Sequence, residues 1–349
     1  MALAELKAGA VYHIARNIGS KFEQKVELQS IRGVTIKDAR SKKQESEDFQ
    51  ERVNYFFSVI VTSNSPEIRA EAQNSVAEEL TNLGALSQAE DVLYGKVGGV
   101  LDDPISRLEG SERQIQEASR FNRRAWIEDS RTGFGREIDY IRQARLWLDA
   151  VQPGARDQRF YDLESTLDHF TGRALLGRAS QGIDKEANLS WSIQYFNKDL
   201  QRYLQFRKED NPRPVGEGFG HVWLARVELL RDNWEHAEEE IDIADELFLE
   251  ATNGNSENEV MAHSYVLKGY FCLKDRRQYG PNLDQAEHCF SLAARIRGKT
   301  HNYPKGEADA HMGLYQVYKA KWDITKAVHH FRRAFNIFPY SVFNPILGG

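Results

Sequence analysis

The sequence predicts a predominantly α-helical protein, and three kinds of observation support this fold class. Apolar residues recur at the three- and four-residue spacing of an amphipathic helix over most of the chain after residue 65. Helix-starting signals, such as the run Ser65-Pro66-Glu67, alternate with breaks that contain glycine or proline. The spacing of these breaks fits helices of roughly 12–16 residues joined by short turns.

Composition excludes several classes of protein. The 349 residues carry 46 Lys and Arg against 52 Asp and Glu, a net charge of −6, which excludes a uniformly basic nucleic-acid binder. The two cysteines, Cys272 and Cys289, cannot build a secreted-type disulfide framework. The richest apolar run, Tyr55 to Val61, is too short to span a bilayer. We therefore expect a cytoplasmic protein with no membrane association.

Residues 1–64 are the least regular part of the chain. Apolar and polar residues alternate over 25–31 and 34–37, on either side of Arg32-Gly33, which fits a short β-hairpin; a helix is the competing interpretation. Apolar residues at helical spacing then predict an amphipathic helix over 46–62. We expect this region to act as a cap, a dimerisation element or an effector-contact module.

Helical punctuation begins at Ser65. This residue is expected to cap a helix whose apolar side runs from Ile68 to Leu83 and which stops at Gly84. Ser87 and Glu90 have the spacing of a capping box for the next helix, expected to end at Gly98-Gly99. Ser111 opens another helix. Later breaks are expected at Thr132-Gly133, Pro153-Gly154, Gly182, Asn211-Pro212, Gly254 and Gly280-Pro281.

The last helical hairpin carries the most informative pattern. Ala327, Phe331, Ala334 and Pro339 are separated by four, three and five residues. Small alanines let two antiparallel helices approach closely, Phe331 would fill the gap between them, and Pro339 would end the second helix. This pattern resembles the tetratricopeptide (TPR) repeat, whose second helix carries A-x3-F-x2-A-x4-P. The resemblance implies an α-solenoid of helical hairpins.

Copies of the pattern recur upstream at irregular intervals. The first alanines of successive copies are 41 and 49 residues apart, where the family expects about 34. The resemblance is strongest over 219–339 and degenerate upstream, so we divide the chain into 1–64, a degenerate helical part 65–215, the repeats 216–340 and a tail 341–349. The clearer copies are Ala286, Phe290 and Ala293, with Gly298 in place of the proline, and Ala237, Ile241 and Ala244. The degenerate ones are Ala125 and Trp126 with Ile141 and Ala144, and Ala174–Gly177 with Trp191 and Tyr195.

The resemblance implies a non-enzymatic protein- or peptide-binding scaffold or regulatory sensor that uses a concave face. TPR domains that clamp a C-terminal carboxylate carry Lys and Asn where this chain has Met312 and Gln316, and Val222 and Arg226, so that subtype is not matched. We expect a protein or peptide ligand, with homodimerisation as a further option. The candidate binding residues are His221, Arg226, His263, Lys268, Arg295, Arg297, His311 and Gln316.

Charge is unevenly distributed along the repeats. Residues 235–259 contain ten acidic side chains and no Lys or Arg, whereas 268–333 contain thirteen Lys or Arg against six Asp or Glu. Solvated helix faces with ion pairs between adjacent repeats explain this most simply. The alternatives are a bipolar groove that orients a charged partner, or RNA binding. The basic patch for RNA would comprise Arg295, Arg297, Lys299 and Lys305, with His301 and Tyr303 among them.

One short motif suggests an enzyme. Arg231 and His236 fit the R-x4-H pattern and resemble the motif of HEPN-type RNases. In those enzymes the Arg stabilises developing negative charge and the His transfers a proton. The alternative is structural, because the residues between them fit an inter-helix turn in which Trp234 is a packing aromatic. We keep an RNase or toxin-type effector as the rival hypothesis.

The sequence offers no cofactor or metal motif. It contains no HExxH pair, no GxxxxGK[ST] loop and no GxSxG elbow. The glycine-rich run 216–220 lacks a preceding strand and a following lysine, so we interpret it as a linker rather than a phosphate-binding loop. We therefore predict neither cofactor nor metal.

Overall fold

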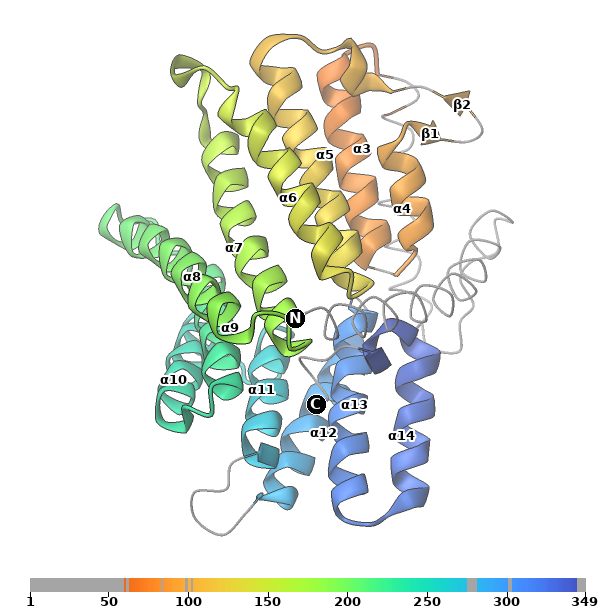
Figure 1. Ribbon diagram of the computed structural model, residues 1–349, viewed down its shortest axis with the longest axis vertical. Helices are drawn as coiled ribbons and strands as arrows, with labels where there is room; N and C mark the ends of the chain where they lie inside the picture. The colour runs from red at the N-terminus through yellow and green to blue at the C-terminus, as the bar shows by residue number, and fades with distance from the viewer. Residues whose placement is uncertain are drawn as a thin grey trace. The chain divides into compact units, whose positions relative to one another are not determined.

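The computed structural model describes residues 60, 63–82, 84–97, 100–101, 103–274, 281–300 and 303–343. Apart from one pair of two-residue strands, the regular structure of these residues is helical, which confirms the predicted all-α fold class (Figure 1). The hairpin predicted at 25–37 and all of the helix predicted at 46–62 except Ile60 lie outside the described residues. The α-helices are α3 (Pro66–Asn82), α4 (Leu86–Leu93), α5 (Gly110–Ser130), α6 (Phe134–Asp149), α7 (Gln158–Ser180), α8 (Lys185–Lys208), α9 (Pro214–Leu230), α10 (Trp234–Ala251), α11 (Met261–Lys274), α12 (Leu283–Thr300), α13 (Pro304–Ala320) and α14 (Ile324–Ile337).

The described chain divides into two compact units. The division falls within α7, between Phe170 and Thr171. We call the described residues up to Phe170 the N-terminal unit and those from Thr171 the C-terminal unit. All of 216–340, where the repeat resemblance is strongest, belongs to the C-terminal unit. Within the described residues, no helix combines the length and the apolar character that a membrane crossing requires.

The N-terminal unit is built around α3, α5 and α6. Helix α5 packs on α6 as a hairpin and also contacts α3 and α4 (Figure 1). Ala125 of α5 is fully buried, and Ile141 and Ala144 of α6 are 2% and 0% exposed. These three residues were predicted as a degenerate copy of the repeat. They form the inner side of this hairpin, where small residues permit close helix approach.

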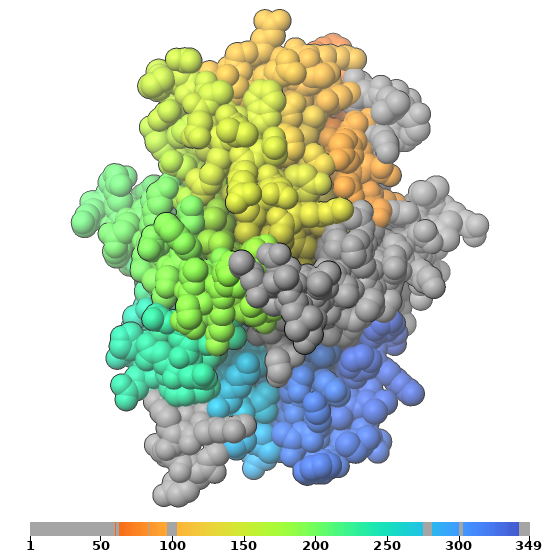
Figure 2. All heavy atoms as spheres, in the orientation of Figure 1, coloured from red at the N-terminus to blue at the C-terminus, as the bar shows by residue number. Residues whose placement is uncertain are grey.

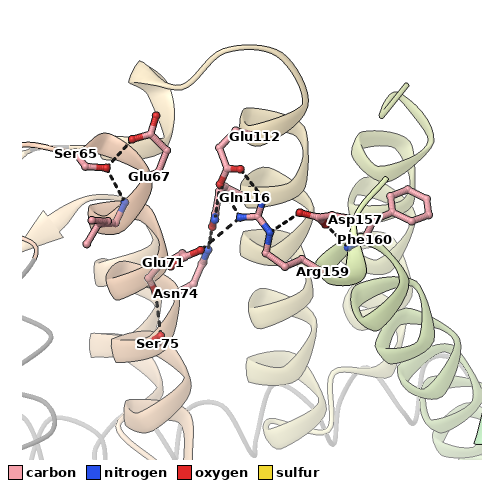
Figure 3. A network of polar contacts seen from close by, with 11 residues as sticks. Ser65, Glu67, Glu71, Asn74, Ser75, Glu112, Gln116, Asp157, Arg159 and Phe160 are labelled. Carbon is pink, nitrogen blue, oxygen red and sulfur yellow. Dashed lines mark hydrogen bonds and ion pairs between the residues drawn. The ribbon is translucent and has the colours of Figure 1, made fainter. Parts of the chain in front are cut away.

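Polar side chains tie three helices of this unit together at one end. The predicted cap of α3 is confirmed, because Ser65 Oγ accepts a hydrogen bond from the Ile68 amide at 3.2 Å. Arg159, at the start of α7, donates to Glu112 of α5 at 2.8 Å and to Glu71 of α3 at 3.4 Å (Figure 3). One guanidinium therefore bridges two carboxylates from different helices.

The helix predicted after Gly84 differs from the expectation. It begins at Leu86 rather than Ser87, its N-cap residue is Ala85, and no side chain caps it, so the capping box is wrong. Gly84 has a φ of +79°, and the chain turns there early enough for Leu86 to be buried completely. The helix also stops early, at Leu93, and is followed by the antiparallel pair of short strands β1 (Lys96–Val97) and β2 (Val100–Leu101).

The C-terminal unit is a series of helical hairpins. Helices α9 and α10, α11 and α12, and α13 and α14 pack as successive pairs, and α8 packs on α9. The second helix of one pair also contacts the first helix of the next, since α10 contacts α11 and α12 contacts α13. In the space-filling view the side chains of α13 and α14 close over the gap between their ribbons (Figure 2). Each pair thus buries its apolar side against its neighbour, as in a solenoid.

The same turn joins four of the helical pairs. In each, one residue adopts a left-handed conformation: Thr132, Gly182, Asp232 and Trp322, with φ between +59° and +77°. The amide of the following residue then donates to the carbonyl five residues back, which satisfies the end of the first helix. These bonds are Gly133 to Glu128 (2.7 Å), Ile183 to Arg178 (3.0 Å), Asn233 to Glu228 (2.9 Å) and Asp323 to Tyr318 (2.9 Å).

Aromatic rings of second helices pack directly on glycines of first helices. A Cβ added at Gly172 would lie 2.6 Å from the Phe196 ring, and one at Gly218 would lie 2.6 Å from Phe248. Phe290 of α12 is packed in the same way against Gly269 of α11, and its ring also contacts Gly313 of α13. Absence of a side chain on these glycines is what lets the rings reach the helix backbones.

The predicted repeat residues are buried, with one exception. Ala286, Phe290 and Ala293 are inaccessible to solvent, and Ala237, Ile241 and Ala244 form the equivalent core of the preceding pair. Phe331, however, is 37% exposed, although its ring lies 5.5 Å from that of Tyr315 on α13. No further α-helix follows α14 in the described part of the chain, where a short 3-10 helix, η3 (Pro339–Phe343), packs against α14 and α13 instead. Pro339 does follow the end of α14, as predicted.

Three other expectations need correction. Helices α5, α7 and α8 have 21, 23 and 24 residues, longer than the predicted range. The run 216–220 is not a linker but lies inside α9, where Gly220 makes room for the Leu200 side chain. Gly298 does not end α12, which continues to Thr300.

Candidate protein-binding face

The first helices of the C-terminal pairs lie next to one another. Helix α11 contacts both α9 and α13, while α10 and α12 pack on the first helices on either side of them. Side chains of α9, α11 and α13 that are not covered by the second helices therefore share one face of the unit. We call it the first-helix face. Its central residues are the partly buried Trp223, Arg226 and His263, and the buried Tyr270 and Asp309 lie on the same helices.

Two arginines contact the ring of Trp223. The guanidinium carbons of Arg173, on α7, and Arg226, on α9, lie 4.7 Å and 4.5 Å from the ring centroid. The same ring stacks on Phe196 of α8, with centroids 6.1 Å apart. Arg226 lies three residues after Trp223 on α9, so helix geometry places both on one side. The Trp223 ring thus holds Arg226 through a cation–π contact.

Arg226 is a partly buried cation that interacts electrostatically with the carboxylate of Asp309 but forms no ion pair with it. Burial lowers the pKa of Arg226, the carboxylate of Asp309 opposes that shift, and Arg173 adds to it by repulsion. Asp309 itself, on α13, accepts a hydrogen bond from the Ser341 hydroxyl at 2.7 Å. The Arg226 side chain makes neither a hydrogen bond nor an ion pair within the described residues. A guanidinium stays protonated at such a site, so its hydrogen-bonding capacity remains open.

His263 lies between aromatic rings at the same face. Its imidazole centroid is 4.8 Å from that of Phe219 on α9 and 5.7 Å from that of Tyr303 at the start of α13. Burial lowers the pKa of His263 well below its usual value, and the nearby Arg297 and Arg226 lower it further. His263 is therefore neutral at physiological pH. The structure brings two predicted residues, Arg226 and His263, to one electropositive place.

Tyr270 contributes a buried hydroxyl to this face. The residue is 5% exposed, and its ring packs edge-on against Phe290, with centroids 4.9 Å apart. Burial raises the pKa of Tyr270 well above its usual value, as does Asp309, whereas Arg226 lowers it. The hydroxyl has no hydrogen-bond partner in the described structure. Buried hydroxyls are normally paired, so this one is exceptional.

Two other predicted residues are engaged with α10. His221 Nδ1 lies 2.6 Å from a carboxylate oxygen of Glu240. Lys268 forms an ion pair with Asp245. Burial alone would lower the pKa of Lys268, but the hydrogen bond and the negative charge of Asp245 together raise it above its usual value. Both side chains thus reach across to the acidic helix α10 and away from Arg226.

The predicted basic patch is paired with the acidic stretch. Arg295 lies 2.8 Å from Glu257, and Lys299 lies 3.1 Å from the same carboxylate. Arg297, only 3% exposed, lies 2.6 Å from Glu259. These contacts join α12 to the loop between α10 and α11. They confirm ion pairing between adjacent repeats as an explanation of the uneven charge.

His311 and Gln316 lie on α13. His311 is buried against His330 of α14, while Gln316 is partly exposed. Met312, at the position where a carboxylate clamp would have a lysine, is buried at 6% exposure. Helix α13 therefore leaves Gln316 partly exposed and keeps His311 inside the unit.

The rival catalytic pair flanks the turn between α9 and α10. Arg231 caps the end of α9, is 42% exposed and lies 3.3 Å from Glu228. His236 is exposed in the first turn of α10. Trp234 packs against Phe271 of α11, with centroids 6.1 Å apart, as expected for a packing aromatic. Arg231 and His236 are thus both solvent-accessible, on either side of Asp232.

Sequence reasoning missed Arg173, Trp223, Tyr270 and Asp309. The i, i+3 spacing of Trp223 and Arg226 is a signal that could have identified that pair. No local pattern links Arg173 or Asp309 to them, because the contacts depend on how three helices pack. Among the described residues, no group of three or more His, Cys, Asp or Glu side chains is arranged to hold a metal ion.

Comparison with known proteins assigns no family. No known protein family and no curated protein matches the chain. Among solved structures, the chain resembles the crystal structure of BtubC (BKLC) from P. vanneervenii, with 18% sequence identity and a TM-score of 0.43, over 77% of this chain and 90% of that one.

Proposed function

We propose that the chain is a non-enzymatic, TPR-like protein- or peptide-binding scaffold or regulatory sensor that binds its partner on the first-helix face. The observation that carries the proposal is the lateral contact of α11 with both α9 and α13. Three helices thereby offer polar and aromatic side chains on one continuous face, the kind of surface that binds an extended or helical peptide.

Photo-crosslinking tests where a partner binds. A benzophenone amino acid is placed at Gln316, which is partly exposed on α13, or at Ile243, which is 40% exposed on α10. The full chain is irradiated in a lysate of its own cells, and linked proteins are identified by mass spectrometry. We expect specific links from position 316 and none from position 243. Links from position 243 alone, or from neither position, contradict the proposal.

The nuclease rival predicts that His236 is essential. Both Arg231 and His236 are accessible to a substrate. If the purified chain cleaves RNA and the His236→Ala variant, still folded by circular dichroism, does not, then an enzyme replaces the scaffold. RNA binding through α12 is less favourable, since Arg295 and Arg297 would first have to leave their carboxylates.

A further inference from the structure

Arg226 and Tyr270, at the first-helix face, are two hydrogen-bond donors that have no acceptor among the described residues. The Arg226 guanidinium contacts the Trp223 ring and makes no hydrogen bond or ion pair in the described residues. The Tyr270 hydroxyl is buried without a partner. An unpaired donor in a partly dehydrated place is costly, and the cost is greatest for a charged group. Both groups therefore remain to be satisfied.

The fold brings these two donors to the same place. Arg226 lies near the end of α9 and Tyr270 near the end of α11, and these helices pack against each other. Both groups interact electrostatically with Asp309 and with each other. Asp309 accepts a hydrogen bond from Ser341 and forms no ion pair with Arg226. A guanidinium and a hydroxyl on adjacent helices, near enough to interact electrostatically, can both donate to one acceptor group.

We propose that Arg226 and Tyr270 together bind an oxyanion, a carboxylate or phosphoryl group carried by a peptide ligand. This inference rests on the proposed function, since it names the chemistry that the first-helix face selects. The oxyanion would accept charge-assisted hydrogen bonds from the guanidinium and one from the phenol. Trp223 holds the guanidinium in position, and Arg173, on the same ring, adds a second positive charge.

The rest of this face favours an anion over a cation. His263 lies near Arg226, Arg297 and Arg173 and is neutral. Arg297 is already neutralised by Glu259, 2.6 Å away. Arg226 has no such partner, so a negatively charged group that displaces water there gains most. A peptide with acidic or phosphorylated side chains is therefore the expected ligand class.

The test uses the full chain and three matched peptide arrays. In the first array, random short peptides contain Asp and Glu; in the second, Asn and Gln replace them; in the third, phosphoserine replaces them. All termini are blocked. We expect the wild-type chain to retain carboxylate or phosphoserine peptides about tenfold more strongly than amide peptides. The array that is preferred identifies the source of the oxyanion.

Three variants assign the preference to its residues. Arg226→Gln and Tyr270→Phe should each remove most of the preference for anionic peptides. Arg295→Gln should not, because Arg295 is 50% exposed, pairs with Glu257 and lies on α12. Retention of amide and anionic peptides to the same degree, unaffected by Arg226→Gln, overturns this inference and leaves the proposed function standing. Retention of no peptide from any array overturns the proposed function as well.

Thermal stability gives an independent readout. If Arg226 is kept for a ligand, Arg226→Met should raise the Tm, because it removes a partly buried charge that no anion neutralises. Arg297→Met should lower the Tm, since it leaves Glu259 without its partner. A fall in the Tm of Arg226→Met as large as that of Arg297→Met would show that Arg226 is held by internal pairing, which overturns the inference.

Discussion

The imidazole rings of His311 and His330 stack between α13 and α14, with their Nδ1 atoms 3.1 Å apart and their centroids 5.2 Å apart. One Nδ1 must donate and the other accept, which two neutral rings of opposite tautomer can do and two protonated rings cannot. The pKa of His311 is lowered to about 3 and that of His330 to about 4; burial is the largest cause for both, and the positive charge of Arg333 contributes to each shift. The carboxylate of Glu307, on α13, lies 3.9 Å from His311 and 3.3 Å from Arg333.

This histidine pair predicts a loss of stability in acid. A histidine whose pKa is lower in the folded state than its usual 6.5 stabilises the fold fully above about pH 6.5 and loses that contribution as the pH falls towards the folded pKa. As the pH falls from about 7.5 to about 5, protonation linked to His311 should lower the free energy of unfolding by about 2 kcal/mol. Denaturant titrations of wild type and His311→Asn should show a shallower pH dependence in the variant. His236→Asn, at an exposed position, is the control and should leave the dependence unchanged.

Gly269→Ala should destabilise the C-terminal unit. The added methyl would lie 2.7 Å from the Phe290 ring, which is itself confined by Gly313. We expect a loss of about 1–3 kcal/mol in unfolding free energy, measured by urea denaturation. Gly298→Ala is a matched control, since its Cβ would meet only Glu307 at 3.7 Å. It should be neutral or stabilising by up to about 1 kcal/mol, as alanine favours helix. Equal losses in the two variants would contradict the packing described for Phe290.

The two aromatic positions of the repeat should differ sharply. Phe290 is completely buried, so Phe290→Ala should cost about 3–5 kcal/mol. Phe331 occupies the same place in its pattern but is 37% exposed, and Phe331→Ala should cost about 1 kcal/mol or less. Calorimetric melting of both variants measures the difference. A large loss at Phe331 would show that a further part of the chain covers this side of α14.

The paired acidic residues before α11 should contribute unequally. Glu259→Gln leaves the buried Arg297 guanidinium without its carboxylate and should cost about 1–2 kcal/mol. Glu257→Gln, which affects the exposed Arg295 and Lys299, should leave the Tm unchanged. Added salt should change little in either variant's Tm relative to wild type. Screening acts mainly on exposed pairs, and the Arg297 guanidinium is buried. Similar Tm values for the two variants would contradict the burial of Arg297.

The sequence by itself determined the helical class, the cap at Ser65, most of the breaks and the burial of the alanines in the repeat. These features depend on neighbours within one or two helical turns, where residue type and spacing fix the backbone and the apolar side. The false capping box at Ser87 and the exposed Phe331 show the limit of local pattern. Whether such a residue is capped or covered depends on which other segment lies against it.

Only the tertiary structure decided which charges are paired. Arg226 and Asp309 are brought within electrostatic range although 83 positions separate them in sequence, whereas Arg297 and Arg295 differ in burial although they are two residues apart. Periodicity predicts that a residue is on a given side of its helix, but not which side chain of another helix it meets. That is set by the stacking of successive hairpins. It leaves Arg226 with neither a hydrogen bond nor an ion pair, and the Tyr270 hydroxyl with no hydrogen-bond partner, within the described residues.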